Sequence, residues 1–183
     1  MQEEHRQIPV EMQDYLESPP RLLPPFSLRS FGVQALTNEW FADKWSFVYF
    51  SHGHCLPSCK SSLSKIKNLQ ASFANNDLQF LIVGIDSEHE TAENLADFLK
   101  FQQLDFANSV TASSQKIDSL ASTFRALFLQ TDYADGSYKI EQEHHIFVVD
   151  PKGRVYATFR PSYTDSSIES AFIKLRHFYA RTE

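Results

Sequence analysis

The chain has 183 residues, of which 42% are hydrophobic and 14% aromatic, and its formal net charge is −6. This length suits one domain with a tail, the apolar content can fill a sizeable core, and the negative charge argues against a nucleic-acid-binding surface. No apolar run approaches the roughly 18 residues of a membrane span, and the polar, acidic start MQEEHRQIPV is unlike a signal peptide. We therefore expect either a cytosolic protein or the mature part of an exported one.

The first 25 residues are predicted to form an irregular arm or stalk that precedes one domain at residues 26–183. Five of the eight prolines lie in this arm, and its hydrophobic residues follow no sustained period. Beyond the arm, the alternation at 26–31 predicts a short strand. The apolar runs at 45–50 and 78–86 predict buried strands of a parallel sheet.

Four segments place apolar residues at helical spacing. The first follows the cysteines and ends at ANND, residues 74–77, and the second begins near Thr91. The third has Ser114 as its predicted cap, and the last carries the capping-box pair Ser166 and Glu169.

The remaining segments complete the predicted architecture. Residues 106–112 form a short strand, residues 133–138 form a turn, and residues 144–159 form a hairpin that turns at PKG. Parallel strand–helix–strand units followed by an antiparallel hairpin and a final helix predict an α/β fold. We expect the thioredoxin-like arrangement, which is a mixed central sheet with helices on both faces and a late β-hairpin.

The only two cysteines, Cys55 and Cys59, lie where a predicted strand passes into a predicted helix. A close pair indicates a disulfide, a metal site or a redox couple. A purely structural disulfide is the less favoured interpretation, because so short a loop removes little unfolded-state entropy. Residues four apart on a helical first turn share a face, so both sulfurs can form a disulfide or bind a soft ion such as Cu(I), with histidine as a further ligand.

Two other groups with this fold match the sequence poorly. Ordinary thioredoxins carry a cis-proline just before the strand of the late hairpin, and residues 133–150 contain no proline. Peroxiredoxins need Thr or Ser three residues before the reactive cysteine, where this chain has His52.

Four stretches of the chain are distinctive in combination: LLPPFSL, KWSFVYF followed by a CxxxC pair, FLIVGID, and YKIEQEHHIFVVDPKGRV. From about Leu22 to Phe178 they resemble the Sco/SenC family of thioredoxin-like copper proteins, which assist assembly of the copper centre of cytochrome c oxidase. The resemblance implies a copper site of two cysteines and one histidine, together with thiol-disulfide activity. It also implies a protein partner, either the copper subunit of the oxidase or another thiol protein. The implied location is periplasmic or otherwise extracytoplasmic, on a membrane anchor outside this chain.

The family's ligands carry over only in part. Cys55 and Cys59 match directly as the catalytic and metal-binding pair. The family histidine lies nine residues before the proline of the DPxG turn, where this chain has Gln142, and an amide is a poor ligand for Cu(I). We expect His144 to replace it, because a strand would place both residues on one face, about 6 to 7 Å apart.

Other polar residues near these motifs have open roles. His52 and His54 are alternative metal ligands, cations beside the thiols, or ordinary loop histidines. Asp86, at the end of a predicted strand, either faces the site or caps the next segment.

Two functions remain. In the first, the chain is a copper chaperone with Cys55, Cys59 and His144 as ligands. In the second, it is a thiol-disulfide oxidoreductase without copper, in which Cys55 attacks a partner disulfide and Cys59 resolves the intermediate. A peroxide-responsive or purely structural domain is the weaker third interpretation.

Overall fold

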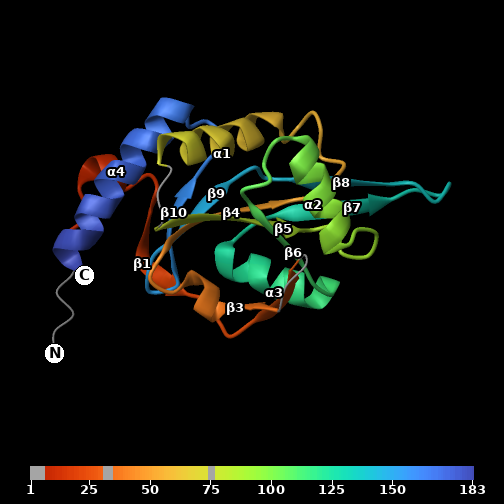
Figure 1. The fold of residues 1–183 in the computed structure, drawn as a ribbon, viewed down its shortest axis with the longest axis horizontal. Helices are drawn as coiled ribbons and strands as arrows, with labels where there is room; N and C mark the ends of the chain where they lie inside the picture. Colours follow the sequence, from red (N-terminus) through yellow and green to blue (C-terminus); the bar gives the residue numbers. More distant parts are fainter. Residues whose placement is uncertain (1–6, 31–34, 74–76) are drawn as a thin grey trace.

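The centre of the protein is a mixed sheet of eight strands: β1 (Leu16–Leu22), β2 (Ser27–Ser30), β3 (Leu36–Thr37), β4 (Trp45–Ser51), β5 (Leu78–Gly84), β6 (Asn108–Thr111), β9 (Ile146–Val149) and β10 (Arg154–Phe159). The computed structural model describes residues 7–30, 35–73 and 77–183. The strand order is β1-β10-β9-β4-β5-β6-β2-β3 (Figure 1). Strands β4, β5 and β6 run parallel, and the strands on either side of them run antiparallel.

The central strands bury both of their faces, which explains their nearly continuous apolar sequence. On β4, Phe47 and Tyr49 belong to one hydrophobic cluster, while Val48 and Phe50 belong to the cluster on the opposite face. The ring of Phe47 stacks on Phe80 of β5, with 5.6 Å between the ring centroids. Strands β4 and β5 pair in parallel over their full length, so their carboxyl ends meet at one edge of the sheet.

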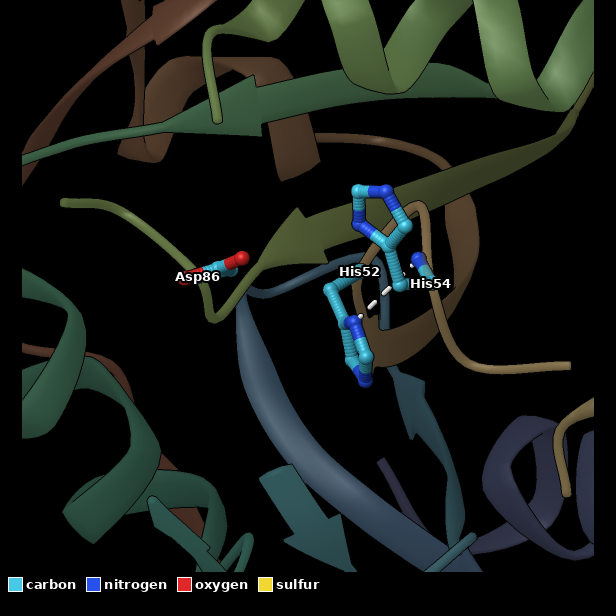
Figure 2. A group of neighbouring side chains, drawn as sticks. All are labelled: His52, His54 and Asp86. Atoms are coloured by element: carbon cyan, nitrogen blue, oxygen red, sulfur yellow. Dashed lines mark hydrogen bonds between the residues drawn. The ribbon is translucent and has the colours of Figure 1, made fainter. Parts of the chain in front are cut away.

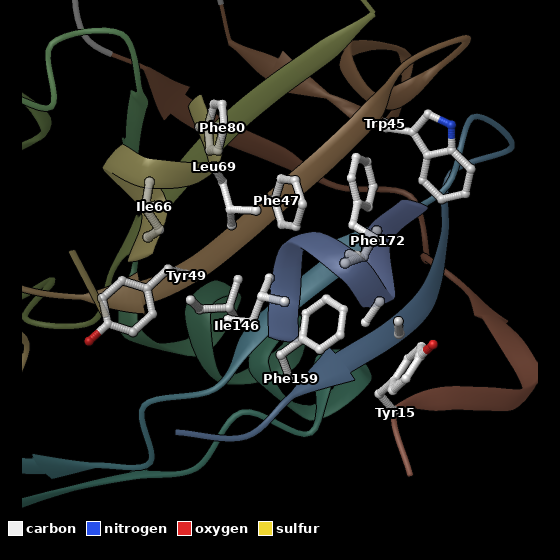
Figure 3. Packing of buried hydrophobic residues seen from close by; sticks show 14 of the residues in the cluster. Tyr15, Trp45, Phe47, Tyr49, Ile66, Leu69, Phe80, Ile146, Phe159 and Phe172 are labelled. Carbon is white, nitrogen blue, oxygen red and sulfur yellow. The ribbon is translucent and has the colours of Figure 1, made fainter. Parts of the chain in front are cut away.

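Helices cover both faces of the sheet, as predicted. They are α1 (Lys60–Ser72), α2 (Ala92–Phe101), α3 (Ser114–Phe124) and α4 (Asp165–Thr182). Helices α1, α2 and α4 pack in the first cluster, and α3 packs in the second, across the sheet (Figure 1). Figure 3 shows Ile66 and Leu69 of α1 and Phe172 of α4 among the rings of Phe47 and Phe80. Among the described helices, none is both long and apolar enough to cross a bilayer.

The expectation of an irregular arm at residues 1–25 is wrong for its second half. Strand β1 pairs with β10 at one edge of the sheet, and the register shifts where Pro19 and Pro20 interrupt the pairing. An edge strand tolerates proline because one side of its backbone has no ladder partner. Arg21 donates two hydrogen bonds to carbonyl oxygens at the end of α3, and Tyr15 is buried in the first cluster. The domain therefore begins before residue 26.

A hairpin of two strands, β7 (Phe128–Asp132) and β8 (Tyr138–Gln142), forms a separate sheet that extends from the body (Figure 1). The sequence predicts its turn at 133–138 but not its strands. The helical spacing Ile117, Leu120, Phe124 and Leu127 extends the predicted third helix close to β7. Helix α3 instead ends at Phe124, and Arg125 adopts the left-handed conformation at its C-cap, with φ of 60°. Leu127 is consequently 62% exposed.

The structure confirms the other predicted strands, at 26–31, 45–50, 78–86, 106–112 and 144–159. Helix α2 begins after Thr91, as expected. Two caps are shifted: Ser113 caps α3 instead of Ser114, and Thr164 caps α4 instead of Ser166. Phe31 and residues 74–76 of the ANND segment lie outside the described residues.

Candidate functional site

The two cysteines lie in the loop that connects β4 to α1 and form a disulfide, with their Cα atoms 5.5 Å apart. Cys59 is the N-cap residue of α1, and its backbone N–H donates to the carbonyl of Cys55 at 3.2 Å. Both residues therefore precede the helix instead of lying in its first turn, although a helix-like hydrogen bond joins them. Cys59 is completely buried and Cys55 is 5% exposed, so Cys55 offers the more accessible sulfur.

His144 lines the same cavity as Cys55. This cavity has a volume of about 250 Å³ and is lined by His52, His54, Cys55, Leu56, Ser58, Ile140, Glu141, Gln142 and His144. The Nδ1 atom of His144 lies 2.6 Å from the Tyr49 hydroxyl, which β4 supplies, and burial lowers the pKa of His144. The imidazole is therefore neutral near pH 7 and held in place through one ring nitrogen.

We expected His144 here because a strand would carry it on the same face as Gln142, and that reason is wrong. Strand β8 ends at Gln142, and His144 lies in the following loop, so strand periodicity does not place the two residues on one face. The contact with Tyr49 brings His144 to the cavity instead. His145 is engaged elsewhere, since its Nε2 lies 3.1 Å from a carboxylate oxygen of Glu143.

Gln142, where the resemblance implies a histidine ligand, connects β8 to β4. Its Nε2 donates to the carbonyl of Phe50 at 2.5 Å. Its Oε1 is buried and has no hydrogen-bond partner in the described part of the chain. A neutral amide held in this way is a poor donor to a soft ion, and of the two residues only His144 provides a nitrogen ligand.

Asp86 lies at the carboxyl end of β5 and is only 2% exposed. Its Oδ1 lies 2.8 Å from Nδ1 of His89, and its Oδ2 accepts a 2.6 Å hydrogen bond from the Tyr138 hydroxyl on β8. Its backbone carbonyl also accepts from the N–H groups of His89 and Glu90. Asp86 thus faces the site and also closes the following turn, which combines the two roles that the sequence left open.

Glu90 belongs to the site although no sequence pattern indicated it. Its two carboxylate oxygens accept from the backbone N–H of Gly53 at 3.1 and 2.8 Å, and burial raises the pKa of Glu90. A Cβ atom at position 53 would overlap Glu90 Oε2. The glycine between His52 and His54 was the only available signal for such a close approach.

His52, His54 and Asp86 form a second group beside the cysteine loop, and both histidines also line the cavity of Cys55 and His144. One donor atom from each lies within 4.8 Å of the other two, and Figure 2 shows the Asp86 carboxylate on the side that faces the imidazole rings. They line a cavity of about 460 Å³ together with residues 136–140 of the hairpin. His52 is buried, and burial lowers its pKa, whereas His54 is exposed.

Taken together, the fold and this site define a thioredoxin-like protein with a disulfide-bonded cysteine pair at a strand-to-helix corner and histidines around it. Residues 15–177 match the family described as SCO1/SenC. The chain belongs to the SCO1/SenC family.

Its relatives are distant but cover most of the chain. Protein SCO1 homolog 1, mitochondrial, of Arabidopsis thaliana is 21% identical over 153 residues, which are 82% of this chain and 46% of that protein. SCO2-like protein RP587 of Rickettsia prowazekii is 23% identical over 139 residues, which are 74% of this chain and 67% of that protein. The chain thus spans about half the length of the Arabidopsis relative.

Solved structures confirm the thioredoxin-like fold. Arabidopsis thaliana ScoI with copper bound superposes with a TM-score of 0.74 at 20% identity, covering 85% of this chain and 99% of that one. Bradyrhizobium japonicum ScoI with copper bound gives 0.71 at 21% identity, covering 86% and 99%.

Proposed function

We propose that this protein is an extracytoplasmic Sco-type thiol-disulfide protein that carries copper on Cys55, Cys59 and His144 and serves assembly of the copper centre of cytochrome c oxidase. One observation carries the proposal: Cys55 and His144 line the same cavity, although 88 residues separate them in the sequence. Reduction of the disulfide provides two thiolates, and soft thiolates together with imidazole suit Cu(I).

Tyr49 supports the role of His144. A metal-binding histidine usually donates its second ring N–H to a hydrogen-bond acceptor, which fixes its orientation and leaves the other nitrogen for the ion. The Tyr49 hydroxyl lies at Nδ1 of His144, so Nε2 is the nitrogen available to copper. Copper is the transported ion in this proposal and not a permanent cofactor.

The same cysteines carry a redox step. In the reduced protein, the Cys55 thiolate attacks a partner disulfide, the partner's S–S bond breaks, and one partner sulfur leaves as a thiolate. Cys59 then attacks the mixed disulfide at Cys55 and releases the second partner thiolate. The protein loses two electrons and ends as the disulfide form seen here, and the partner gains them.

The proposed partner and location rest on the relatives. Several are named as mitochondrial proteins, and a related structure is that of a SCO1/SenC family lipoprotein from Bacillus anthracis. Another is described as a member of the Sco family of cytochrome c oxidase assembly proteins that has a disulfide switch. These descriptions favour an extracytoplasmic site of action and an oxidase subunit or a further thiol protein as the partner.

A copper titration tests the proposal. The reduced protein should compete with a chromogenic Cu(I) chelator for one equivalent of Cu(I), and His144→Ala should weaken binding at least about tenfold. His145→Ala is the matched control, because this neighbouring histidine pairs with Glu143 instead. Equal Cu(I) affinity of the two variants would show that His144 is not a ligand. Absence of Cu(I) binding by the reduced protein would contradict the copper function.

The second candidate function is thiol-disulfide exchange without copper. It is favoured by Gln142, whose amide is bound to the Phe50 carbonyl at the position where the family has its histidine. In that case Cys59→Ser should trap a mixed disulfide with a partner thiol protein, while the reduced wild-type protein takes up no Cu(I). Cu(I) binding by the reduced protein that is weakened in His144→Ala would favour the copper-carrying function instead.

A further inference from the structure

The larger cavity, around Asp86, combines three features of a cation site. Its first feature is the donor set: two imidazoles and a carboxylate from His52, His54 and Asp86, with donor atoms within 4.8 Å of one another. Asp86 comes from the end of β5 and the histidines from the loop after β4, so the parallel pairing of these strands brings the donors together (Figure 2).

The second feature is negative charge without a lysine or arginine partner. The buried Asp86 carboxylate contacts the Tyr138 hydroxyl and the His89 imidazole, and the Glu90 carboxylate contacts the N–H of Gly53. In the described ranges, neither carboxylate forms an ion pair with Lys or Arg. Lys139 also lines the cavity, but its ammonium lies 2.7 Å from Glu141. Burying carboxylates is costly even when they accept hydrogen bonds, so a bound cation would stabilise this arrangement.

The third feature is room to adjust. Donors of one tetrahedral ion, at about 2.0 to 2.2 Å from it, lie about 3.3 Å apart, so these donors must close by up to about 1.5 Å. His54 is exposed, so a change of its side-chain rotamer can supply this shift. Nδ1 of His52 accepts a long hydrogen bond of 3.2 Å from the backbone N–H of His54, and a cation at this nitrogen replaces that bond.

We propose that His52, His54 and Asp86 form a second metal site, whose donors include no sulfur, for a borderline divalent ion of the Zn²⁺ or Cu²⁺ class. Imidazole nitrogens with one carboxylate suit these ions, whereas Cu(I) prefers the thiolates and Ca²⁺ or Mg²⁺ prefer all-oxygen ligands. Because none of its ligands is a sulfur, this site binds its ion equally well when Cys55 and Cys59 form a disulfide. The inference therefore does not depend on the copper function proposed above.

Calorimetric titration of the oxidised protein with Zn²⁺ tests the site, after a thiol assay confirms that no free thiol is present. We expect one equivalent to bind, and His52→Ala and His54→Ala each to weaken binding at least about tenfold. His177→Ala, which removes an exposed histidine of α4, is the matched control and should bind Zn²⁺ as the wild type does. No binding, or equal binding by all three variants, overturns the proposal.

Two further measurements keep the result unambiguous. The double variant Cys55→Ser, Cys59→Ser should retain Zn²⁺ binding, and its loss there would assign the ion to the cysteine site instead. In the oxidised wild type, the EPR spectrum of bound Cu²⁺ should show hyperfine splitting from two imidazole nitrogens, and His54→Ala should show one. Failure of Cu(I) uptake by the reduced protein would leave both results unchanged, so the two proposals fail separately.

Discussion

The two sides of the cysteine loop share His52 and His54 and differ in the other donors that they present. One side adds the sulfur of Cys55 and the imidazole of His144, which lies against the Tyr49 hydroxyl. The other offers only nitrogen and oxygen donors, in a larger cavity around Asp86. Sulfur donors appear only on reduction, whereas imidazole and carboxylate are present in both redox states. Reduction of the disulfide thus changes the donors of one cavity and leaves the donors of the other unchanged.

A single segment, residues 138–144, closes both sides. Tyr138 donates to Asp86 on one side, and His144 contacts Tyr49 on the other. Between them, Gln142 donates to the carbonyl of Phe50 and fixes β8 to β4. The difference between the two cavities therefore depends on how this segment lies against the carboxyl ends of β4 and β5.

Replacing Cys55, the more accessible cysteine, should have the largest effect, and it should affect Cu(I) binding but not Zn²⁺ binding. In Cys55→Ser, thiol-disulfide exchange should disappear and Cu(I) affinity should fall at least about 100-fold, because only one thiolate remains. Zn²⁺ binding by the same variant should be unchanged. Stopped-flow exchange assays and the two metal titrations measure these effects, and parallel loss of both metals would show that the two sides are one site.

Reduction of the disulfide should lower the free energy of unfolding by about 2 kcal/mol, the loop-closure entropy of a five-residue loop. Urea unfolding of the oxidised and reduced protein measures the difference. The variant Cys55→Ser, Cys59→Ser should unfold like the reduced wild type and show no response to reductant. A much larger loss would mean that reduction also disrupts the packing of the buried Cys59.

Tyr138→Phe should lower the free energy of unfolding by about 1 to 2 kcal/mol, because it removes a hydrogen bond to a buried carboxylate. The matched control is Tyr133→Phe, which alters an exposed side chain of the hairpin turn and should change stability by less than about 0.5 kcal/mol. Cu(I) affinity should remain as in the wild type, since the change lies on the nitrogen and oxygen side. Equal stability of the two variants would contradict a structural role for the contact with Asp86.

The smallest expected effect is a loss of stability at alkaline pH. Two tyrosines cause it, and the reason for the raised pKa differs between them. Burial raises the pKa of Tyr49 to about 12, and the hydrogen bond to Asp86 raises the pKa of Tyr138 to about 12, from ordinary values of 10.0. The unfolded phenols ionise first, so stability should be complete below about pH 10 and fall as pH rises toward 12. Between pH 10 and 12, the free energy of unfolding should fall less steeply with pH in Tyr49→Phe than in the wild type. Equal pH dependence of the two proteins would exclude this contribution.

Local sequence patterns predicted the parts of the fold that depend on neighbouring residues. The apolar run of β4 followed by Cys55 and Cys59, the parallel partner β5 and the hairpin of β9 and β10 all follow from periodicity and turn composition. The same patterns misplaced β1, because its prolines argue against a strand and only pairing with β10 at the sheet edge makes one possible. They also missed β7 and β8, which are short and have no fully buried residue to mark a core-facing side.

The sequence by itself determined the family, the thioredoxin-like fold and the cysteine pair, because these are encoded in contiguous motifs. Only the tertiary structure decided which polar groups accompany the sulfurs. It placed Gln142 on a backbone carbonyl, His144 against Tyr49, and Asp86 beside His52 and His54. The physical reason is that a ligand set is a matter of distances between side chains far apart in the chain, and strand register and loop path set those distances.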